Sequence, residues 1–334
     1  MSISDRIDAE ARVPLDALLS DLPGGFNAIP DITARRTAVA ALLKKATAGI
    51  PANENVVVDD RQVPGPTDHR ELTVRVYRPV AATGLLPGML YIHGGGMILG
   101  TLESEHVIAT MLCERVNAVV VAVDYRLAPE HPFPAGPEDC YAGLVWMNDN
   151  SPALGVDPER IAIYGGSAGG GLTCAVTLMA RDRRGPRLCF QMPIYPMIDD
   201  TNSTPSSHEI LDVGIWDRAG NVEAWKMYLG AVHGSVDVSP YAAPARATDL
   251  RGLPPAFIDV GELDLFRDED IQYAARLLHA GVTTEFHLYP GSYHAAEVFA
   301  PDSALARRIW ATRIAALERA LGSVNIATAM ERQA

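Results

Sequence analysis

The chain has 334 residues, of which 48% are hydrophobic and 21% charged, so its composition is that of a folded globular protein and not of a disordered one. At roughly 150 residues per domain, this length fits two domains or one large α/β domain with insertions. The net charge of −13 disfavours broad binding to nucleic-acid phosphates, and no apolar run reaches the roughly 18 residues that a membrane-spanning helix needs.

The first predicted elements are two helices, because apolar residues recur at helical spacing over residues 2–21 and again over 33–48. These helices precede any strand, so we interpret residues 1–50 as an N-terminal helical arm that forms part of a cap. The first residues include acids but no basic stretch before an apolar core. We therefore expect no secretory signal and a cytoplasmic location.

From about residue 54 onward strands alternate with helices, which indicates crossovers within a parallel sheet. The run 118–123 is apolar throughout, as a strand covered on both faces requires. Residues 197–250 are too long for a plain loop, so we interpret them as a cap insertion between core segments 51–196 and 251–334. Strands are predicted at 56–58, 72–79, 89–92, 118–123, 160–164, 188–195, 255–260 and 284–289, and helices at 102–116, 138–149, 168–182, 267–279 and 303–321.

The segment 165–169 fits the pattern G-x-S-x-G, with Ser167 at its centre. It follows a predicted strand and precedes a predicted helix, which is the context of a nucleophile elbow. A serine on such a sharp turn exposes its Oγ, and the flanking glycines let neighbouring elements approach closely. The same letters also occur by chance in glycine-rich turns, but this placement favours a catalytic serine.

The sequence His93-Gly94-Gly95-Gly96 ends the strand predicted at 89–92 and is typical of the oxyanion hole of lipases and esterases. We expect the backbone N–H groups of Gly94, Gly95 and Ala168 to form that hole. A phosphate-binding loop fits poorly, because no Gly-Lys-Ser/Thr occurs in the chain and Leu99 stands where G-x-G-x-x-G needs its last glycine.

A catalytic acid and a base should follow the serine in that order. Asp264 lies just past the strand predicted at 255–260, and His294 lies just past the last predicted strand. These two are our candidates for the acid and the base. The rival carboxylates are Glu262, Asp268 and Glu269, and we interpret them as structural or solvated. The rival histidines are His279, which lies on a predicted helix, and His287, which lies inside a predicted strand; neither is on a loop at a strand end.

The chain resembles the bacterial hormone-sensitive-lipase-like carboxylesterases, a group of α/β hydrolases, over residues from about 70 to 320. The motifs that carry the resemblance are 93–96, 124–130 continuing to 133–135, the elbow at Ser167, and 264–269. The resemblance implies an α/β-hydrolase fold, with an eight-stranded, mostly parallel sheet flanked by helices and a helical cap. It also implies hydrolysis of short-chain esters without a cofactor, and a homodimer such as many of these proteins form.

The chain departs from this family in places. Gly166 stands where the family usually has Asp before the serine, Ala295-Ala296 replaces Gly-Phe after the histidine, and Met97 replaces an aromatic residue after the glycines. We expect the last two changes to reshape the pocket wall. Met97, Tyr195 and Trp216 are our candidate pocket residues.

The expected mechanism is attack of Ser167 on an ester carbonyl, with His294 as the base and Asp264 holding the imidazole. An amidase or peptidase would use the same residues. A non-catalytic small-molecule receptor also exists on this fold, but it lacks the histidine that is present here. A dinucleotide-dependent oxidoreductase would need G-x-G-x-x-G after its first parallel strand, and that pattern is absent.

The partner expected from this interpretation is a small-molecule ester, with no nucleic acid, no membrane insertion, no metal and no cofactor. The cysteines form no C-x-x-C pair and lie among apolar residues, which favours buried small hydrophobes over disulfides. They are Cys113, Cys140, Cys174 and Cys189. We expect Arg126 to pair with a nearby carboxylate, so that the segment around it is scaffold.

Overall fold

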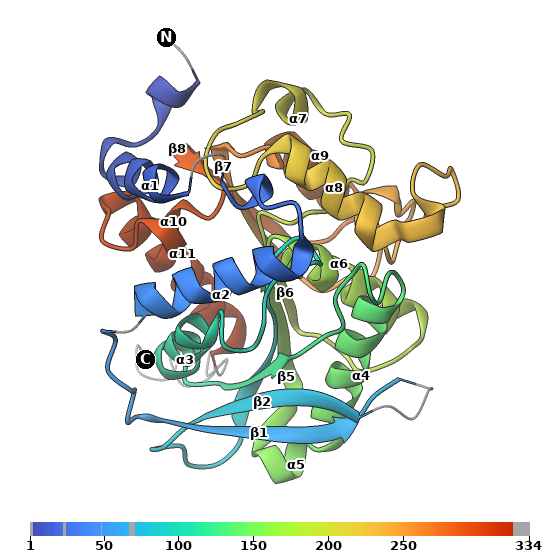
Figure 1. Ribbon diagram of the computed structural model, residues 1–334. Helices are drawn as coiled ribbons and strands as arrows, with labels where there is room; N and C mark the ends of the chain where they lie inside the picture. The colour runs from blue at the N-terminus through green and yellow to red at the C-terminus, as the bar shows by residue number, and fades with distance from the viewer. Residues whose placement is uncertain (1–2, 23–24, 48, 67–70, 323–334) are drawn as a thin grey trace, which may run out of the picture.

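The computed structural model describes residues 3–22, 25–47, 49–66 and 71–322, and an eight-stranded sheet lies at its centre (Figure 1). The strand order is β1-β2-β4-β3-β5-β6-β7-β8. The pairs β1–β2 and β2–β4 are antiparallel, and the remaining pairs are parallel. The predicted fold is thereby confirmed. The strands are β1 Val56–Pro64, β2 Glu71–Pro79, β3 Leu86–Ile92, β4 Val119–Val123, β5 Val156–Gly166, β6 Phe190–Ile194, β7 Ala256–Leu263 and β8 Thr284–Tyr293.

Helices connect the parallel strands and cover the sheet. The long ones agree with the predicted ranges to within a few residues, except that the first helix, predicted over 2–21, begins only at Ala9. Positions 2 and 48 of the two N-terminal predictions, and residues 67–70 and 323–334 of the core segments, lie outside the described residues. The α-helices are α1 Ala9–Asp21, α2 Ile32–Thr47, α3 His106–Val116, α4 Ala135–Asp149, α5 Ser151–Leu154, α6 Ala168–Asp182, α7 Pro205–Glu209, α8 Arg218–Leu229, α9 Arg267–His279, α10 Ala296–Phe299 and α11 Ala304–Leu321. Single 3-10 turns are η1 Ser4–Arg6, η2 Phe26–Ala28, η3 Gly230–Val232 and η4 Pro244–Arg246.

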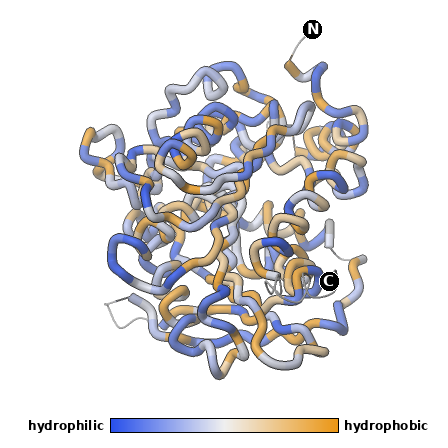
Figure 2. Tube along the Cα trace, turned by 180° about the vertical axis from the view of Figure 1, so that it is seen from behind, coloured by the Kyte–Doolittle hydropathy of each residue, from blue (hydrophilic) through white to orange (hydrophobic). Residues whose placement is uncertain are grey.

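The central strands form because they are apolar on both faces. Every residue of β3 and β4 is buried, and Figure 2 shows hydrophobic stretches along the central segments. Side chains alternate between the faces, so Met89 and Tyr91 pack with α3 and α11, whereas Leu90 and Ile92 pack with α4 and α6. The result is a three-layer α/β arrangement that holds the carboxyl ends of the strands in fixed positions.

Polar contacts link the N-terminal helices to the segment 197–250. Asn27 donates a hydrogen bond to Asp217 at 2.9 Å, and Arg35 on α2 donates to Glu223 on α8 at 2.7 Å. In Figure 1, α2 and α8 lie on the same side of the molecule, far from β1. These contacts join the N-terminal helices to the segment 197–250, and the division into an arm, an insertion and a core stays a prediction. Trp225 and Tyr228 on α8 are fully buried in the core beneath.

The segment around Arg126 has the scaffold role expected from the sequence. Its guanidinium binds the fully buried Asp139 of α4 through hydrogen bonds of 2.8 to 3.1 Å, and its backbone N–H donates to the same carboxylate. All four cysteines are free; Cys189 is only half-buried, and the other three are buried. Among the described residues, no helix is long and apolar enough to cross a membrane.

Candidate active site

Ser167 stands on a tight turn between β5 and α6. Its φ of 58° and ψ of −120° are strained for a residue with a side chain. The turn is possible because glycines stand two residues before and two residues after the serine: a Cβ at Gly169 would lie 2.1 Å from the Ile92 carbonyl oxygen, and one at Gly165 would lie 2.3 Å from the Gly169 carbonyl oxygen. This is the geometry of a nucleophile elbow.

The structure brings Ser167, His294 and Asp264 together at the carboxyl ends of β5, β8 and β7. His294 Nε2 lies 2.9 Å from Ser167 Oγ, and His294 Nδ1 lies 2.7 Å from Asp264 Oδ2. All three side chains are buried. A hydroxyl bonded to an imidazole, which is in turn oriented by a carboxylate, can act as a nucleophile with its own general base.

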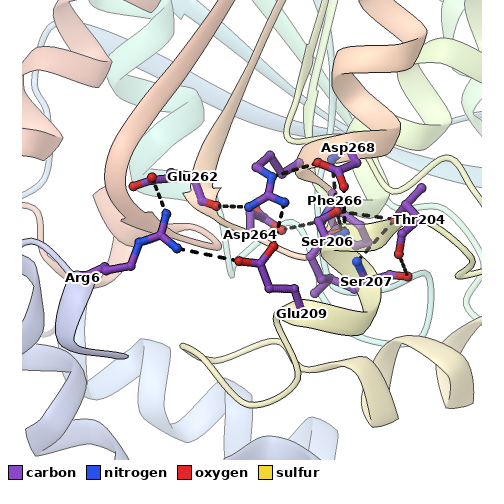
Figure 3. A network of polar contacts seen from close by, with 11 residues as sticks. Arg6, Thr204, Ser206, Ser207, Glu209, Glu262, Asp264, Phe266 and Asp268 are labelled. Atoms are coloured by element: carbon purple, nitrogen blue, oxygen red, sulfur yellow. Dashed lines mark hydrogen bonds and ion pairs between the residues drawn. The ribbon is translucent and has the colours of Figure 1, made fainter. Parts of the chain in front are cut away.

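The loop that carries Asp264 is held by α7 of the insertion, as Figure 3 shows. Asp264 Oδ1 accepts the Phe266 backbone N–H at 3.0 Å. Ser206 Oγ donates to the Leu265 carbonyl oxygen at 2.8 Å, and the Ser206 backbone N–H donates to Asp268 at 2.7 Å. These bonds hold the loop in place, and they fix the orientation in which the Asp264 carboxylate meets the His294 imidazole.

The rival carboxylates are occupied elsewhere. Glu262 binds Arg6 and accepts the Gly291 N–H, and Asp268 binds Arg267 and the Ser206 backbone. Glu269 accepts the backbone N–H groups of residues 198 and 199. Of the carboxylates considered from the sequence, Asp264 is the one that bonds to His294.

Aromatic rings fix the His294 imidazole in place. Tyr195 and Phe266 meet it edge-on, with ring centroids 4.9 Å and 5.2 Å away. Burial against these rings leaves the imidazole few rotamers. His287, the rival in β8, instead bonds to the Glu285 carboxylate at 2.8 Å.

The glycine loop differs from expectation at Gly94. Its N–H donates to the Glu105 carboxylate at 2.7 Å, so it is not open to a substrate oxygen, and the assignment of Gly94 to the oxyanion hole is wrong in this structure. In the part of the chain that the structure describes, the N–H groups of Gly95, Gly96 and Ala168 have no acceptor. Gly96, which the sequence analysis left out of the hole, is the better candidate.

The orientation of these N–H groups follows from peptide planarity, because C=O and N–H point in opposite directions across a trans peptide. The Gly94 carbonyl lies 2.8 Å from His93 Nδ1, so the Gly95 N–H points the other way. The Gly95 carbonyl accepts from Leu99 N at 2.8 Å, so the Gly96 N–H likewise points away from that bond. The φ of 109° at Gly95 is one that only glycine adopts readily.

His93 serves this loop as a neutral hydrogen-bond donor. Its side chain is buried, its ring stacks on Tyr125 with centroids 4.2 Å apart, and burial lowers the pKa of His93 to about 4. The imidazole is therefore uncharged near pH 7, with its Nδ1 proton directed at the Gly94 carbonyl. Tyr125 O–H donates to the His93 carbonyl at 3.0 Å and fixes the preceding peptide.

A cavity of about 160 Å³ opens onto Ser167 and His294. Its walls are mainly apolar and aromatic, and its lining contains no Lys or Arg among the described residues. Tyr195 and Trp216 line it, as expected for pocket residues. Met97 does not: it is buried behind the loop, with its methyl group near Gly171. The aromatic cavity wall above the glycines is Trp216, whose ring packs on Gly96.

Two acids near the site, the half-buried Glu105 and the buried Glu297, were missed by the sequence analysis. Glu105 and Glu297 both line the cavity. Tyr195 O–H donates to Glu297 at 2.7 Å, and Arg313 of α11 donates to Glu297 at 2.6 Å. No motif marks these residues; the only local signal is that Glu297 lies three residues after His294.

The ring of Tyr195 packs beside Gly166, where the family usually has an aspartate. A Cβ at Gly166 would lie 3.4 Å from the Tyr195 ring, so that ring covers the side of the elbow where a larger residue 166 would project. Tyr195 itself has a φ of 32°, which a bulky residue rarely adopts. The elbow is thus closed by packing on this side.

Comparison with known proteins agrees with this geometry. The family described as alpha/beta hydrolase fold matches residues 89–298, most of the chain. The chain belongs to the α/β hydrolase family. Carboxylesterase NlhH of Mycobacterium tuberculosis is 40% identical over 257 residues, covering 75% of this chain and 79% of that protein. An arylesterase of Saccharolobus solfataricus is 35% identical over 268 residues, covering 78% and 82%.

Solved structures support the same assignment. A structure titled Bacterial Heroin Esterase matches with a TM-score of 0.90 and 37% identity, covering 96% of this chain and all of that one. Esterase LipW of Mycobacterium marinum matches with a TM-score of 0.83 and 34% identity, covering 96% and 97%. The resemblance to the carboxylesterases of this family, and with it an enzyme of that class, is confirmed. Among the described residues, no group of His, Cys, Asp and Glu is arranged to hold a metal ion.

Proposed function

We infer that this protein hydrolyses carboxylic esters through an acyl-enzyme on Ser167. The observation that carries this proposal is the pair of hydrogen bonds made by His294, 2.9 Å to Ser167 Oγ and 2.7 Å to Asp264. In the first step Ser167 Oγ bonds to the carbonyl carbon while its proton passes to His294 Nε2. Asp264 accepts the Nδ1–H and stabilises the imidazolium that forms.

Negative charge then collects on the former carbonyl oxygen. The N–H groups of Gly95, Gly96 and Ala168 are the donors proposed for it, because each lacks another acceptor in the described structure. One donor of this kind contributes roughly 3–4 kcal/mol to transition-state stability. Collapse of the tetrahedral intermediate breaks the ester C–O bond, and His294 protonates the departing alcohol.

Water completes the cycle. It attacks the acyl carbon as His294 takes its proton, and the Ser167–acyl bond breaks as Oγ recovers the proton. This releases the carboxylic acid and restores the free serine. All steps use the chain's own residues and one water molecule.

The cavity favours neutral, compact esters. Apolar and aromatic side chains make up most of its walls, and its volume of about 160 Å³ is small for a small-molecule site, which fits a compact substrate. The name of one related protein, an arylesterase, fits an ester with an aromatic portion. We propose short-chain acyl esters as the substrate class.

The test compares p-nitrophenyl esters of increasing acyl length with matched p-nitroanilides. We expect the highest kcat/KM for short esters and little turnover of anilides. Ser167→Ala should lower kcat by a factor on the order of 10⁴–10⁶, whereas Ser104→Ala, which changes another serine of the same cavity, should leave most activity. Faster anilide hydrolysis would favour an amidase, and binding without turnover would favour a receptor.

Two further expectations stay predictions, namely a homodimer and a cytoplasmic location. An exposed edge of the sheet is present at β8, where Leu288 is partly exposed. Light scattering of the purified protein would give its mass in solution and so distinguish a dimer from a monomer.

A further inference from the structure

Glu105 lies against the catalytic site although it belongs to none of the motifs. It immediately precedes α3, and its side chain lines both the catalytic cavity and a small internal cavity behind the glycine loop. One carboxyl oxygen accepts the Gly94 N–H at 2.7 Å, and the other accepts the Tyr91 O–H. Both oxygens are thus occupied, and one of the bonds is to the loop that carries the oxyanion donors.

The peptide units of this loop are held one after another. Tyr125 binds the His93 carbonyl, and Glu105 binds the Gly94 N–H of the same peptide unit. The next unit is held by His93 at the Gly94 carbonyl, and the following one by Leu99 at the Gly95 carbonyl. Because consecutive glycines rotate easily, the orientation of each unit depends on these bonds.

We propose that Glu105 is a positioning residue of the oxyanion hole, which holds the Gly94 N–H so that the Gly95 and Gly96 N–H groups face the reacting carbonyl. This inference rests on the proposed function. Without Glu105, the Gly94 N–H loses its acceptor, and the first peptide unit of the loop keeps its bond from Tyr125 but loses the second bond that fixes its orientation. The donors beyond it then no longer meet the oxyanion in a fixed direction.

The effect falls on the transition state and not on substrate binding. The oxyanion exists only once Ser167 has attacked, so a misdirected donor lowers kcat while KM stays nearly constant. A misplacement of about 1 Å costs up to roughly 10²-fold in rate. A residue that merely filled space would change stability or KM instead.

The chain offers a conservative replacement for Glu105. Burial raises the pKa of Glu105, because desolvation disfavours its charged form. A glutamine has the same shape, keeps a carbonyl oxygen for the Gly94 N–H, and can donate to the Tyr91 oxygen from its amide. Glu105→Gln should therefore restore what Glu105→Ala removes.

A matched control lies two residues earlier. Glu103 belongs to the same segment, but 76% of its side chain is exposed and it binds Arg75, away from the loop. Glu103→Ala removes a carboxylate of the same charge without touching the hole. It separates the positioning effect from a general change in the charge around the cavity.

The experiment measures kcat and KM of the wild type and of Glu105→Ala, Glu105→Gln and Glu103→Ala on one neutral p-nitrophenyl ester. It also measures the affinity of each for a trifluoromethyl ketone and for the matching methyl ketone. Ser167 adds to the trifluoromethyl ketone, which places an oxyanion in the hole, whereas the methyl ketone binds mainly in its uncharged form. The ratio of the two affinities reports on the hole and is insensitive to a fraction of unfolded protein.

For Glu105→Ala we expect kcat to fall by about 10–100-fold with KM within about 3-fold, and the affinity ratio to fall by a similar factor. Glu105→Gln and Glu103→Ala should stay within about 3-fold of the wild type in every quantity. The inference is overturned if Glu105→Ala keeps the wild-type affinity ratio, or if Glu105→Gln loses as much as Glu105→Ala. An inactive wild type that also fails to bind the trifluoromethyl ketone would instead overturn the proposed function.

Discussion

Arg313 and Asp259 form a bidentate ion pair, with hydrogen bonds of 2.7 and 3.0 Å, in a region that solvent hardly reaches. The same guanidinium binds Glu297, which accepts the O–H of Tyr195. The Tyr195 ring in turn meets the His294 imidazole. One cation from α11 thus balances buried carboxylates on β7 and α10 and supports the segment that carries His294.

Replacing Arg313 should destabilise the protein strongly. Arg313→Ala leaves the carboxylates of Asp259 and Glu297 buried without their cation, and breaking a buried pair in this way costs about 3–5 kcal/mol. Urea denaturation of Arg313→Ala against Arg307→Ala, an exposed arginine of the same helix, measures the difference. A loss below about 1 kcal/mol would show that the pairing does not stabilise the fold.

Asp270 should make stability depend on pH. Its carboxyl oxygens are buried without a hydrogen-bond partner, and burial together with Glu269 and Asp264 raises the pKa of Asp270 well above its ordinary value. A carboxyl whose pKa is higher in the folded state stabilises the fold at pH below its unfolded pKa of about 3.9, and this contribution is lost as the pH rises through the folded value.

Asp270→Asn should accordingly raise the free energy of unfolding at pH 7 by more than the ~0.5 kcal/mol typical of a surface change. The gain should shrink as the pH falls toward 4. Denaturation curves at several pH values, with the exposed Glu318→Gln as the control, test this. A variant that is less stable than the wild type at pH 7 would contradict the prediction.

Two glycines beside Ser167 should respond differently to alanine. A Cβ at Gly169 would lie 2.1 Å from the Ile92 carbonyl oxygen, whereas one at Gly166 would make ordinary contact with the Tyr195 ring at 3.4 Å. Gly169→Ala should cost about 3 kcal/mol or more, because backbone must move. Gly166→Ala should fold and keep activity within about 3-fold. Equal stability of the two variants would show that the close approach at Gly169 is not a constraint.

A negative charge on the acyl group should lower kcat/KM relative to an otherwise similar neutral ester. Glu105 and Glu297 line the cavity, which no Lys or Arg lines among the described residues, so a substrate carboxylate there would be buried without a cation. A penalty of ~2 kcal/mol corresponds to roughly 30-fold. We expect kcat/KM for the p-nitrophenyl half-ester of succinic acid to be at least about 30-fold below that of p-nitrophenyl butyrate. Methylating the free carboxylate should recover most of the loss; similar rates for the charged and neutral esters would refute the prediction.

Much of the fold could be predicted because local signals agree with the tertiary structure. The continuous apolar runs at 89–92 and 118–123 are typical of strands covered on both sides, and both lie in the middle of the sheet. Ser167, Asp264 and His294 each follow a strand, and the carboxyl ends of parallel strands meet at one edge. Strand ends and residue types were therefore enough to find these candidates.

The errors have a different origin. Gly94 was assigned to the oxyanion hole because its N–H belongs to the motif, but the partner of that N–H is a side chain from the start of α3. Met97 was assigned to the pocket by its place after the glycines, yet a φ of 63° turns the chain there and buries its side chain. Neither a contact with a distant carboxylate nor the direction of a tight turn is visible in residue types and spacing.

The mass of the protein after reaction with a fluorophosphonate tests the central claim most directly. We predict one adduct per chain, located on Ser167 by peptide mapping, with esterase activity lost in proportion to the labelled fraction. Ser167→Ala should gain no adduct. Loss of activity without labelling of Ser167, or full activity in a fully labelled protein, would contradict the account.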